Sequence, residues 1–74
     1  MITCLLHTKF KSVSLFRDGC LIGVINEFDN EPVIIFNHDF DETGRLSFDE
    51  IDIIQDNWNQ MIEMWKKETY EHRR

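Results

Sequence analysis

Prolines, cysteines and long apolar runs are scarce in this sequence. Its 74 residues include one proline, three glycines and two cysteines, and no segment approaches the roughly 18 apolar residues of a membrane span. The first segment, MITCLLHTKF, lacks both the basic start and the cleavage site of a signal peptide. We therefore expect a cytoplasmic protein in which Cys4 and Cys20 are reduced thiols rather than a disulfide.

Basic residues are missing from the middle of the chain. The formal net charge is −6, and Arg45 is the only base between residues 27 and 56. No basic stripe with interleaved aromatic side chains is present to hold a phosphate backbone, so we expect no direct binding to nucleic acid. The charge distribution favours a cation or a basic protein surface as the partner. The acids of this segment are Glu27, Asp29, Glu31, Asp39, Asp41, Glu42, Asp49, Glu50, Asp52 and Asp56.

Residue patterns of catalytic sites are absent too. No serine has a recognisable histidine and aspartate partner, and the acids around Arg45 lack the further bases that a metal nuclease needs to hold a phosphate. Cys4 and His7 do not begin a zinc site, because residues three apart on a strand point to opposite faces. We predict that the protein is not an enzyme.

Apolar and aromatic residues are plentiful enough for one small folded domain, residues 1–74. Hydrophobic residues make up 42% of the chain and charged residues 30%, which differs from the composition of disordered chains. A chain of this length buries only roughly 60% of its unfolded surface, so its core alone is marginal. Support from a partner chain or a metal would therefore matter.

Four short segments have the composition of β-strands. Asp18-Gly19 separates two of them and is a preferred hairpin dipeptide, because both turn residues need positive φ. The pattern predicts strands over residues 2–7, 11–17, 20–27 and 32–38, with Pro32 near the start of an edge strand. The expected cross-strand neighbours are Leu15–Ile22, Val13–Val24, Phe16–Leu21, Ser12–Ile25, Val24–Ile35 and Ile25–Ile34.

From Ser47 the apolar period changes from two residues to 3.6, which predicts an amphipathic helix over residues 48–69. Ser47 and Glu50 form an S-x-x-E capping box at its start. We therefore predict an α+β fold, an antiparallel three- to four-stranded β-meander with one long C-terminal amphipathic helix packed on one face. The apolar stripe of the helix consists of Ile51, Ile54, Trp58, Met61, Ile62 and Trp65.

One helix covers only one face of a sheet, yet apolar residues point to both faces in this register. An uncovered apolar face usually marks an interface, so we expect a homodimer through a sheet face, or a docked partner. Alternatively, the strand that begins at Ile2 curls over this face. The two sets are Phe16, Leu21, Ile25, Ile34 and Phe36 on one face and Val13, Leu15, Ile22 and Val24 on the other.

The stretch DFDETGRLSFDE, residues 39–50, resembles the calcium-binding loop of EF-hand proteins. Thr43 is the only departure from the pattern D-x-[DN]-x-[DN]-G-x5-E. The resemblance implies that Ca²⁺ is bound by oxygen atoms, including the Arg45 carbonyl and a water molecule on Ser47. The implied metal ligands are Asp39, Asp41, Thr43, Arg45, Ser47 and Glu50.

The same stretch also has an interpretation without a metal or any other cofactor. Residues 41–44 are typical of a turn, and acids with a capping box are typical of a helix N-terminus. An EF-hand also needs a helix before its loop, whereas EPVIIFNH is rich in residues that favour a strand. Both interpretations stay open at this point.

In size, acidity and order of elements, the chain looks like the small inhibitors that phages and mobile elements direct against host defence enzymes, including anti-CRISPR proteins. The resemblance implies a non-catalytic interaction module, an inhibitor or decoy that binds a basic, nucleic-acid-binding protein in the host cytoplasm. A calcium-binding module using residues 39–50 is the alternative. The residues expected to contact the partner are Asp39, Asp41, Glu42, Asp49, Asp52 and Asp56.

Overall fold

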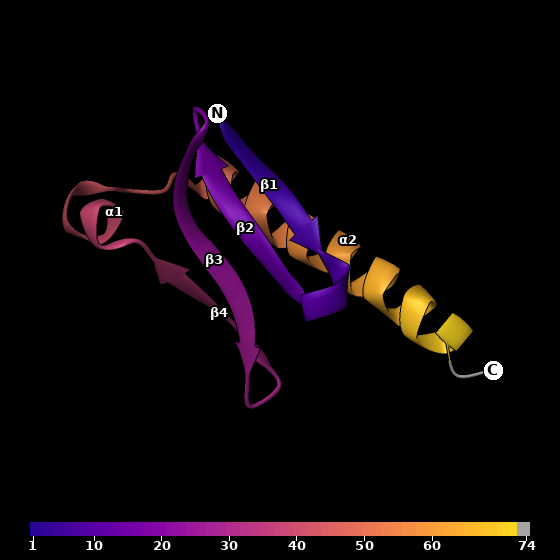
Figure 1. The fold of residues 1–74 in the computed structure, drawn as a ribbon. Helices are drawn as coiled ribbons and strands as arrows, with labels where there is room; N and C mark the ends of the chain where they lie inside the picture. Colours follow the sequence, from indigo (N-terminus) through magenta and orange to yellow (C-terminus); the bar gives the residue numbers. More distant parts are fainter. Residues whose placement is uncertain (73–74) are drawn as a thin grey trace.

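A four-stranded antiparallel sheet and one long helix form the body of the molecule (Figure 1). The computed structural model describes the backbone of residues 1–72 and the side chains of residues 1–40 and 44–70. Its elements are β1 (Ile2–His7), a short 3-10 helix η1 (Thr8–Phe10), β2 (Ser12–Arg17), β3 (Cys20–Phe28), β4 (Glu31–Phe36), α1 (His38–Thr43) and α2 (Phe48–His72). The strands neighbour one another in chain order, which confirms the predicted α+β meander with a C-terminal helix.

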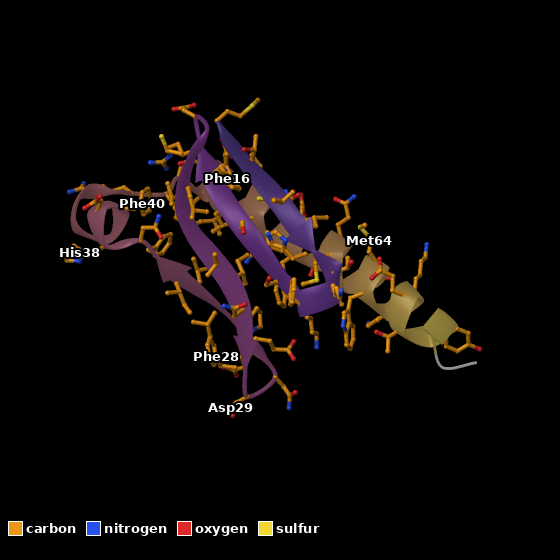
Figure 2. All side chains as sticks on the ribbon, in the orientation of Figure 1. Phe16, Phe28, Asp29, His38, Phe40 and Met64 are labelled. Atoms are coloured by element: carbon orange, nitrogen blue, oxygen red, sulfur yellow. The ribbon has the colours of Figure 1, made fainter. Side chains whose placement is uncertain are left out.

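Tight turns at both ends of β3 fix this strand order. Asp18 and Gly19 have positive φ values of 50° and 83°, as a two-residue hairpin turn requires. The turn from β3 to β4 has φ values of 51° at Asp29 and 66° at Asn30, and these residue types tolerate the left-handed region better than most. Asp29 marks the tip of this second hairpin in Figure 2. Both hairpins therefore follow from their turn residues.

β3 contains a bulge that changes the predicted register. Phe16 pairs with Leu21, as predicted. One residue earlier in β2, Leu15 pairs with Gly23, so Ile22 is the extra residue of the bulge. The predicted pairs Leu15–Ile22, Val13–Val24 and Ser12–Ile25 are therefore wrong, and the pairs that form instead are Leu15–Gly23, Ser14–Val24 and Val13–Ile25.

Gly23 gives the bulge a local cause. A Cβ atom at this position would lie 2.6 Å from the carbonyl oxygen of Ile35, so any larger residue would push β3 and β4 apart. Glycine inside a strand often marks a bulge or a close approach of two backbones. Beyond the bulge the predicted neighbours Val24–Ile35 and Ile25–Ile34 are confirmed.

The core lies between α2 and one face of the sheet, where the helix packs across β1, β2 and η1. Because of the bulge, Ile22 and Ile25 are both buried on this face, at 6% and 2% exposure. Each fully buried aliphatic side chain stabilises the fold by about 1.5–3 kcal/mol relative to an exposed one. The buried residues of the core are Ile2, Val13, Leu15, Ile22, Ile25, Ile54, Trp58 and Met61.

α2 begins at the capping box and continues past the sheet. The backbone N–H of Ser47 donates to the Glu50 carboxylate over 2.9 Å, and the backbone N–H of Glu50 donates to the Ser47 hydroxyl over 3.2 Å, which confirms the predicted reciprocal cap. The helix has 25 residues, and Figure 1 shows its last turns extending beyond the strands. Across residues 1–72, no helix combines the length and apolarity that a membrane crossing needs.

The segment between β4 and α2 differs from the prediction. The strand predicted to reach residue 38 ends at Phe36, and the N–H of Asn37 donates to the Ile22 carbonyl at the bulge over 2.8 Å. The short helix α1 follows where a turn was predicted. Phe40 of α1 stacks on Phe36 with ring centroids 5.0 Å apart, and Figure 2 places Phe40 on the side of α1 that faces the sheet. This aromatic contact anchors α1 to the end of β4.

Within residues 1–72, no helix or strand covers the sheet face away from α2, which faces the reader in Figure 1. Leu5, Ser14, Val24 and Ile35 are direct neighbours in a row across the four strands. Leu5 is 53% exposed and Ile35 is 45% exposed. β1 does not curl over this face, because it pairs with β2 at the edge of the sheet.

The predicted membership of the two faces is partly wrong, because residues of β3 beyond the bulge change sides. Ile25 and Ile34 pack in the core beneath α2, and Phe36 stacks on α1. Val24 was predicted opposite Phe16 but shares the uncovered face with it. This apolar open face consists of Leu5, Phe16, Leu21, Val24, Phe28, Val33 and Ile35. The homodimer predicted through a sheet face stays a prediction about this surface.

Candidate protein-binding surface

Arg17 of β2 contacts both the segment that precedes α2 and the first turn of α2. Its guanidinium donates to both Glu50 carboxylate oxygens, over 2.8 Å to Oε1 and 2.9 Å to Oε2 from Nη2, and Nε donates to Oε2 over 3.2 Å. The same Nη2 donates to the Arg45 carbonyl over 2.6 Å, and the guanidinium carbon lies 5.1 Å from the centre of the Phe40 ring. One side chain of β2 therefore contacts α1, the backbone at residue 45 and the first turn of α2.

The Glu50 carboxylate is stabilised in its charged form by this arrangement. The backbone N–H of Ser47 and the Arg17 guanidinium together hold the pKa of the Glu50 carboxyl below its ordinary value. Hydrogen bonds and a nearby positive charge both favour the ionised carboxylate. Glu50 is thus a structural acid of the fold.

In the described part of the EF-hand-like stretch, Arg17 holds two of the oxygen atoms that are implied as metal ligands. Asp39 and Thr43 belong to α1, and Asp39 is exposed. The Arg45 carbonyl and the Glu50 carboxylate, two of the implied ligands, accept hydrogen bonds from Arg17 instead. The side chains of Asp41, Glu42 and Thr43 lie outside the described residues.

Calcium binding by this stretch stays a prediction. Among the described side chains, no three His, Cys, Asp or Glu residues are grouped closely enough to hold a metal ion. A cation that used Glu50 and the Arg45 carbonyl would have to compete with the Arg17 guanidinium for the same oxygen atoms. Sequence analysis missed this competition, because nothing near residues 39–50 in the chain indicates a base from β2.

The two cysteines are free thiols at different depths. Cys4 of β1 is half-buried, and burial raises the pKa of its thiol. Cys20 is exposed at the start of β3. A buried thiol with a raised pKa is a poor nucleophile, because the thiolate is the reactive form.

Lys11, which directly precedes β2, also forms an ion pair. Lys11 Nζ donates to Glu27 over 2.9 Å, and it lies 4.1 Å from the centre of the Trp65 ring of α2. Both partners of the ion pair are about a quarter exposed. Lys11 and Arg17 therefore neutralise Glu27 and Glu50 where sheet and helix meet.

The outer side of α2 carries acids in a line, here called the acidic stripe. Its members follow at intervals of three, four and seven residues, which places them along one face of a helix, opposite Ile54, Trp58 and Met61. All are exposed. Within residues 1–40 and 44–70, none of them takes part in an ion pair or a side-chain hydrogen bond. The acidic stripe consists of Asp49, Asp52, Asp56 and Glu63.

The structure thus separates the residues predicted to contact a partner. Asp49, Asp52 and Asp56 come together on α2, and Asp39 lies apart from them on α1. At 1.5 Å per residue, the acidic stripe is a line of negative charge about 20 Å long. No protein-family model, curated protein or solved structure matches the chain.

Proposed function

We propose that the protein is a non-catalytic acidic interaction module that binds a basic protein surface through the acidic stripe of α2. The observation that carries this proposal is the position of the stripe. Its carboxylates lie opposite the packed side of the helix, exposed and without basic partners among the described residues. None of these carboxylates forms an ion pair within residues 1–40 and 44–70, so they are available to another molecule.

The acidic stripe is presented on a rigid support. α2 is capped at its start by Ser47 and Glu50 and packed along Ile54, Trp58 and Met61. Binding to a rigid surface loses less conformational entropy than binding to a flexible one. Carboxylates fixed along one line also attract a complementary basic patch over a distance of about a Debye length, about 8 Å at physiological salt.

A basic groove that normally holds nucleic acid is the kind of surface that such a stripe fits. The lysines and arginines of such a groove are spaced to contact a line of phosphates. A line of carboxylates can pair with the same cations. The protein would then act as a decoy or inhibitor of a nucleic-acid-binding protein. An inhibitor of the phage or mobile-element type acting in a host cytoplasm is consistent with the size and acidity of the chain.

Capture of the partner from the lysate of the natural host tests this proposal. The stripe variant carries Asp49→Asn, Asp52→Asn and Asp56→Asn. The control variant removes the same number of charges from exposed acids outside the stripe, through Asp29→Asn, Glu31→Gln and Glu68→Gln. Circular dichroism first establishes that both fold, since acids in the first turn of a helix contribute about 0.5 kcal/mol each.

Wild type and control variant are expected to capture the same basic, nucleic-acid-binding protein, and the stripe variant is expected to lose it. Raising the salt concentration should weaken capture, because exposed charges are screened. Equal capture by the folded stripe variant would show that the acidic stripe is only a solvated face of the helix.

A further inference from the structure

An apolar groove runs beside the acidic stripe, between α2 and β4. α2 packs across β1 and β2 and leaves part of the same sheet face open toward β4. Figure 1 shows β4 at the edge of the sheet opposite β1. The groove has a volume of about 480 Å³, and its lining residues are Ile25, Pro32, Ile34, Ile54, Gln55, Trp58 and Asn59.

The groove is apolar inside and carries amides on its helix side. Ile25, Ile54 and Trp58 are buried residues of the core, so the bottom of the groove is a fixed surface. Gln55 and Asn59 are exposed and line the groove from α2. Their amides can donate and accept hydrogen bonds at its edge.

Two acids of the stripe neighbour these amides. Asp52 precedes Gln55 by three residues, and Asp56 precedes Asn59 by three residues, so each acid lies beside one amide on the helix surface. The order across α2 is therefore apolar groove, amides, carboxylates. A molecule that fills the groove places its own flanking groups next to Asp52 and Asp56.

This charge pattern selects the occupant. A second copy of this chain, with a net charge of −6, would bring further acids toward the stripe. An uncharged apolar segment would cover the carboxylates with nothing to pair them, at a cost in desolvation. An apolar side chain flanked by lysine or arginine satisfies both parts of the surface.

We infer that the groove takes an apolar side chain of the basic partner, flanked in its contact segment by lysine or arginine. This inference rests on the proposed function and adds a short-range contact to it. The stripe attracts the partner from a distance and its effect falls with salt, whereas the groove holds one or a few side chains by burial. The volume of the groove lies within the roughly 300–1,000 Å³ of ligand-sized sites.

Two synthetic helical peptides test the inference on the full chain. Both carry the same lysines, and one has leucines on its apolar face where the other has alanines. Binding is followed by nuclear magnetic resonance of the ¹⁵N-labelled protein, in which the Trp58 indole and the side-chain amides of Gln55 and Asn59 report on the groove. The leucine peptide is expected to shift these signals and to bind roughly tenfold more tightly than the alanine peptide.

A blocking variant and a matched control sharpen the experiment. Gln55→Trp places a large side chain over the groove, and Gln60→Trp places the same side chain at an exposed position of α2 outside it. Neither changes a charge. The tenfold advantage of the leucine peptide is expected to disappear in Gln55→Trp and to remain in Gln60→Trp, with both variants folded by circular dichroism.

The outcomes separate this inference from the proposed function. If both peptides bind equally in a salt-dependent manner and the groove signals do not move, the groove assignment is wrong and the stripe still binds cations. If Gln55→Trp and Gln60→Trp bind the leucine peptide equally well, the groove assignment is likewise overturned. If neither peptide binds at low salt, the groove and the stripe both fail as binding surfaces.

Discussion

The two sides of α2 carry acids in opposite settings. Glu50 faces the sheet and is held by Arg17, whereas Asp49, Asp52 and Asp56 on the outer side have no basic partner among the described side chains. A carboxylate that a base of the sheet reaches becomes part of the fold, and a carboxylate that no base reaches stays available to another molecule. The number of acids in a sequence does not reveal this difference, because it depends on where each helix face points.

Substitution of two neighbouring isoleucines, one on each side of α2, is expected to give the largest difference in stability. Ile54 is 2% exposed and Ile53 is 39% exposed. Ile54→Ala is expected to lower the free energy of unfolding by about 2–5 kcal/mol, because it leaves a cavity in the core. Ile53→Ala is expected to change it by less than about 0.5 kcal/mol. Urea unfolding followed by circular dichroism measures both, and similar losses would contradict the assignment of the two sides.

Removal of Arg17 tests the paired acid. Arg17→Leu abolishes the bonds to Glu50 and to the Arg45 carbonyl, so we expect a loss of stability smaller than that of Ile54→Ala. Asp49→Asn, one residue before Glu50 on the outer side, is expected to cost less than Arg17→Leu. Hydrogen exchange at residues 44–47 should also accelerate in Arg17→Leu. An unchanged exchange rate there would mean that Arg17 does not fix the loop.

The dependence of stability on pH distinguishes Glu50 from an unpaired acid. Its folded-state pKa is lowered, so its contribution is present above the unfolded value of about 4.3 and is lost as pH falls through the lowered value. Glu50→Gln should therefore be less stable than wild type at pH 7, and the two should converge as the pH falls through the lowered pKa of Glu50. Urea midpoints across the acidic range measure the difference, and a gap that stays constant with pH would contradict the stabilisation of the Glu50 carboxylate by Ser47 and Arg17.

Addition of Ca²⁺ is expected to change the stability of the protein less than any of these substitutions. Because Arg17 occupies Glu50 and the Arg45 carbonyl, millimolar Ca²⁺ should leave the melting temperature of the wild type unchanged. Binding through residues 39–50 would instead raise stability, by about 2.7 kcal/mol at a hundredfold excess over Kd. Titration of wild type and Arg17→Leu side by side shows whether Arg17 is the competitor.

The sequence was informative wherever a structural feature depends on residues close together in the chain. The Asp18-Gly19 turn, the capping box of Ser47 and Glu50 and the 3.6-residue period of α2 each act within a few residues. The bulge at Ile22 had a local signal too, the glycine that follows it, but its consequence for the two sheet faces depends on the approach of β4.

Long-range contacts between side chains could not be predicted in this way. Arg17 and Glu50 are 33 residues apart, and only the packing of α2 on the sheet brings them together. The groove beside Gln55 depends on how far α2 leaves β4 uncovered, which no periodicity encodes. The absence of ion pairs between the acidic stripe and the described bases is likewise a result of tertiary structure, since it requires that Lys11 and Arg17 lie on the other side of the helix.

The most direct test of the acidic stripe is the association rate with the captured partner as a function of salt. Wild type, the stripe variant and the control variant are compared at several ionic strengths. We predict that the rates of wild type and control variant fall steeply with salt, whereas the stripe variant associates slowly at low salt and changes little. The same rate and the same salt dependence for all three proteins would contradict a role for the acidic stripe in binding.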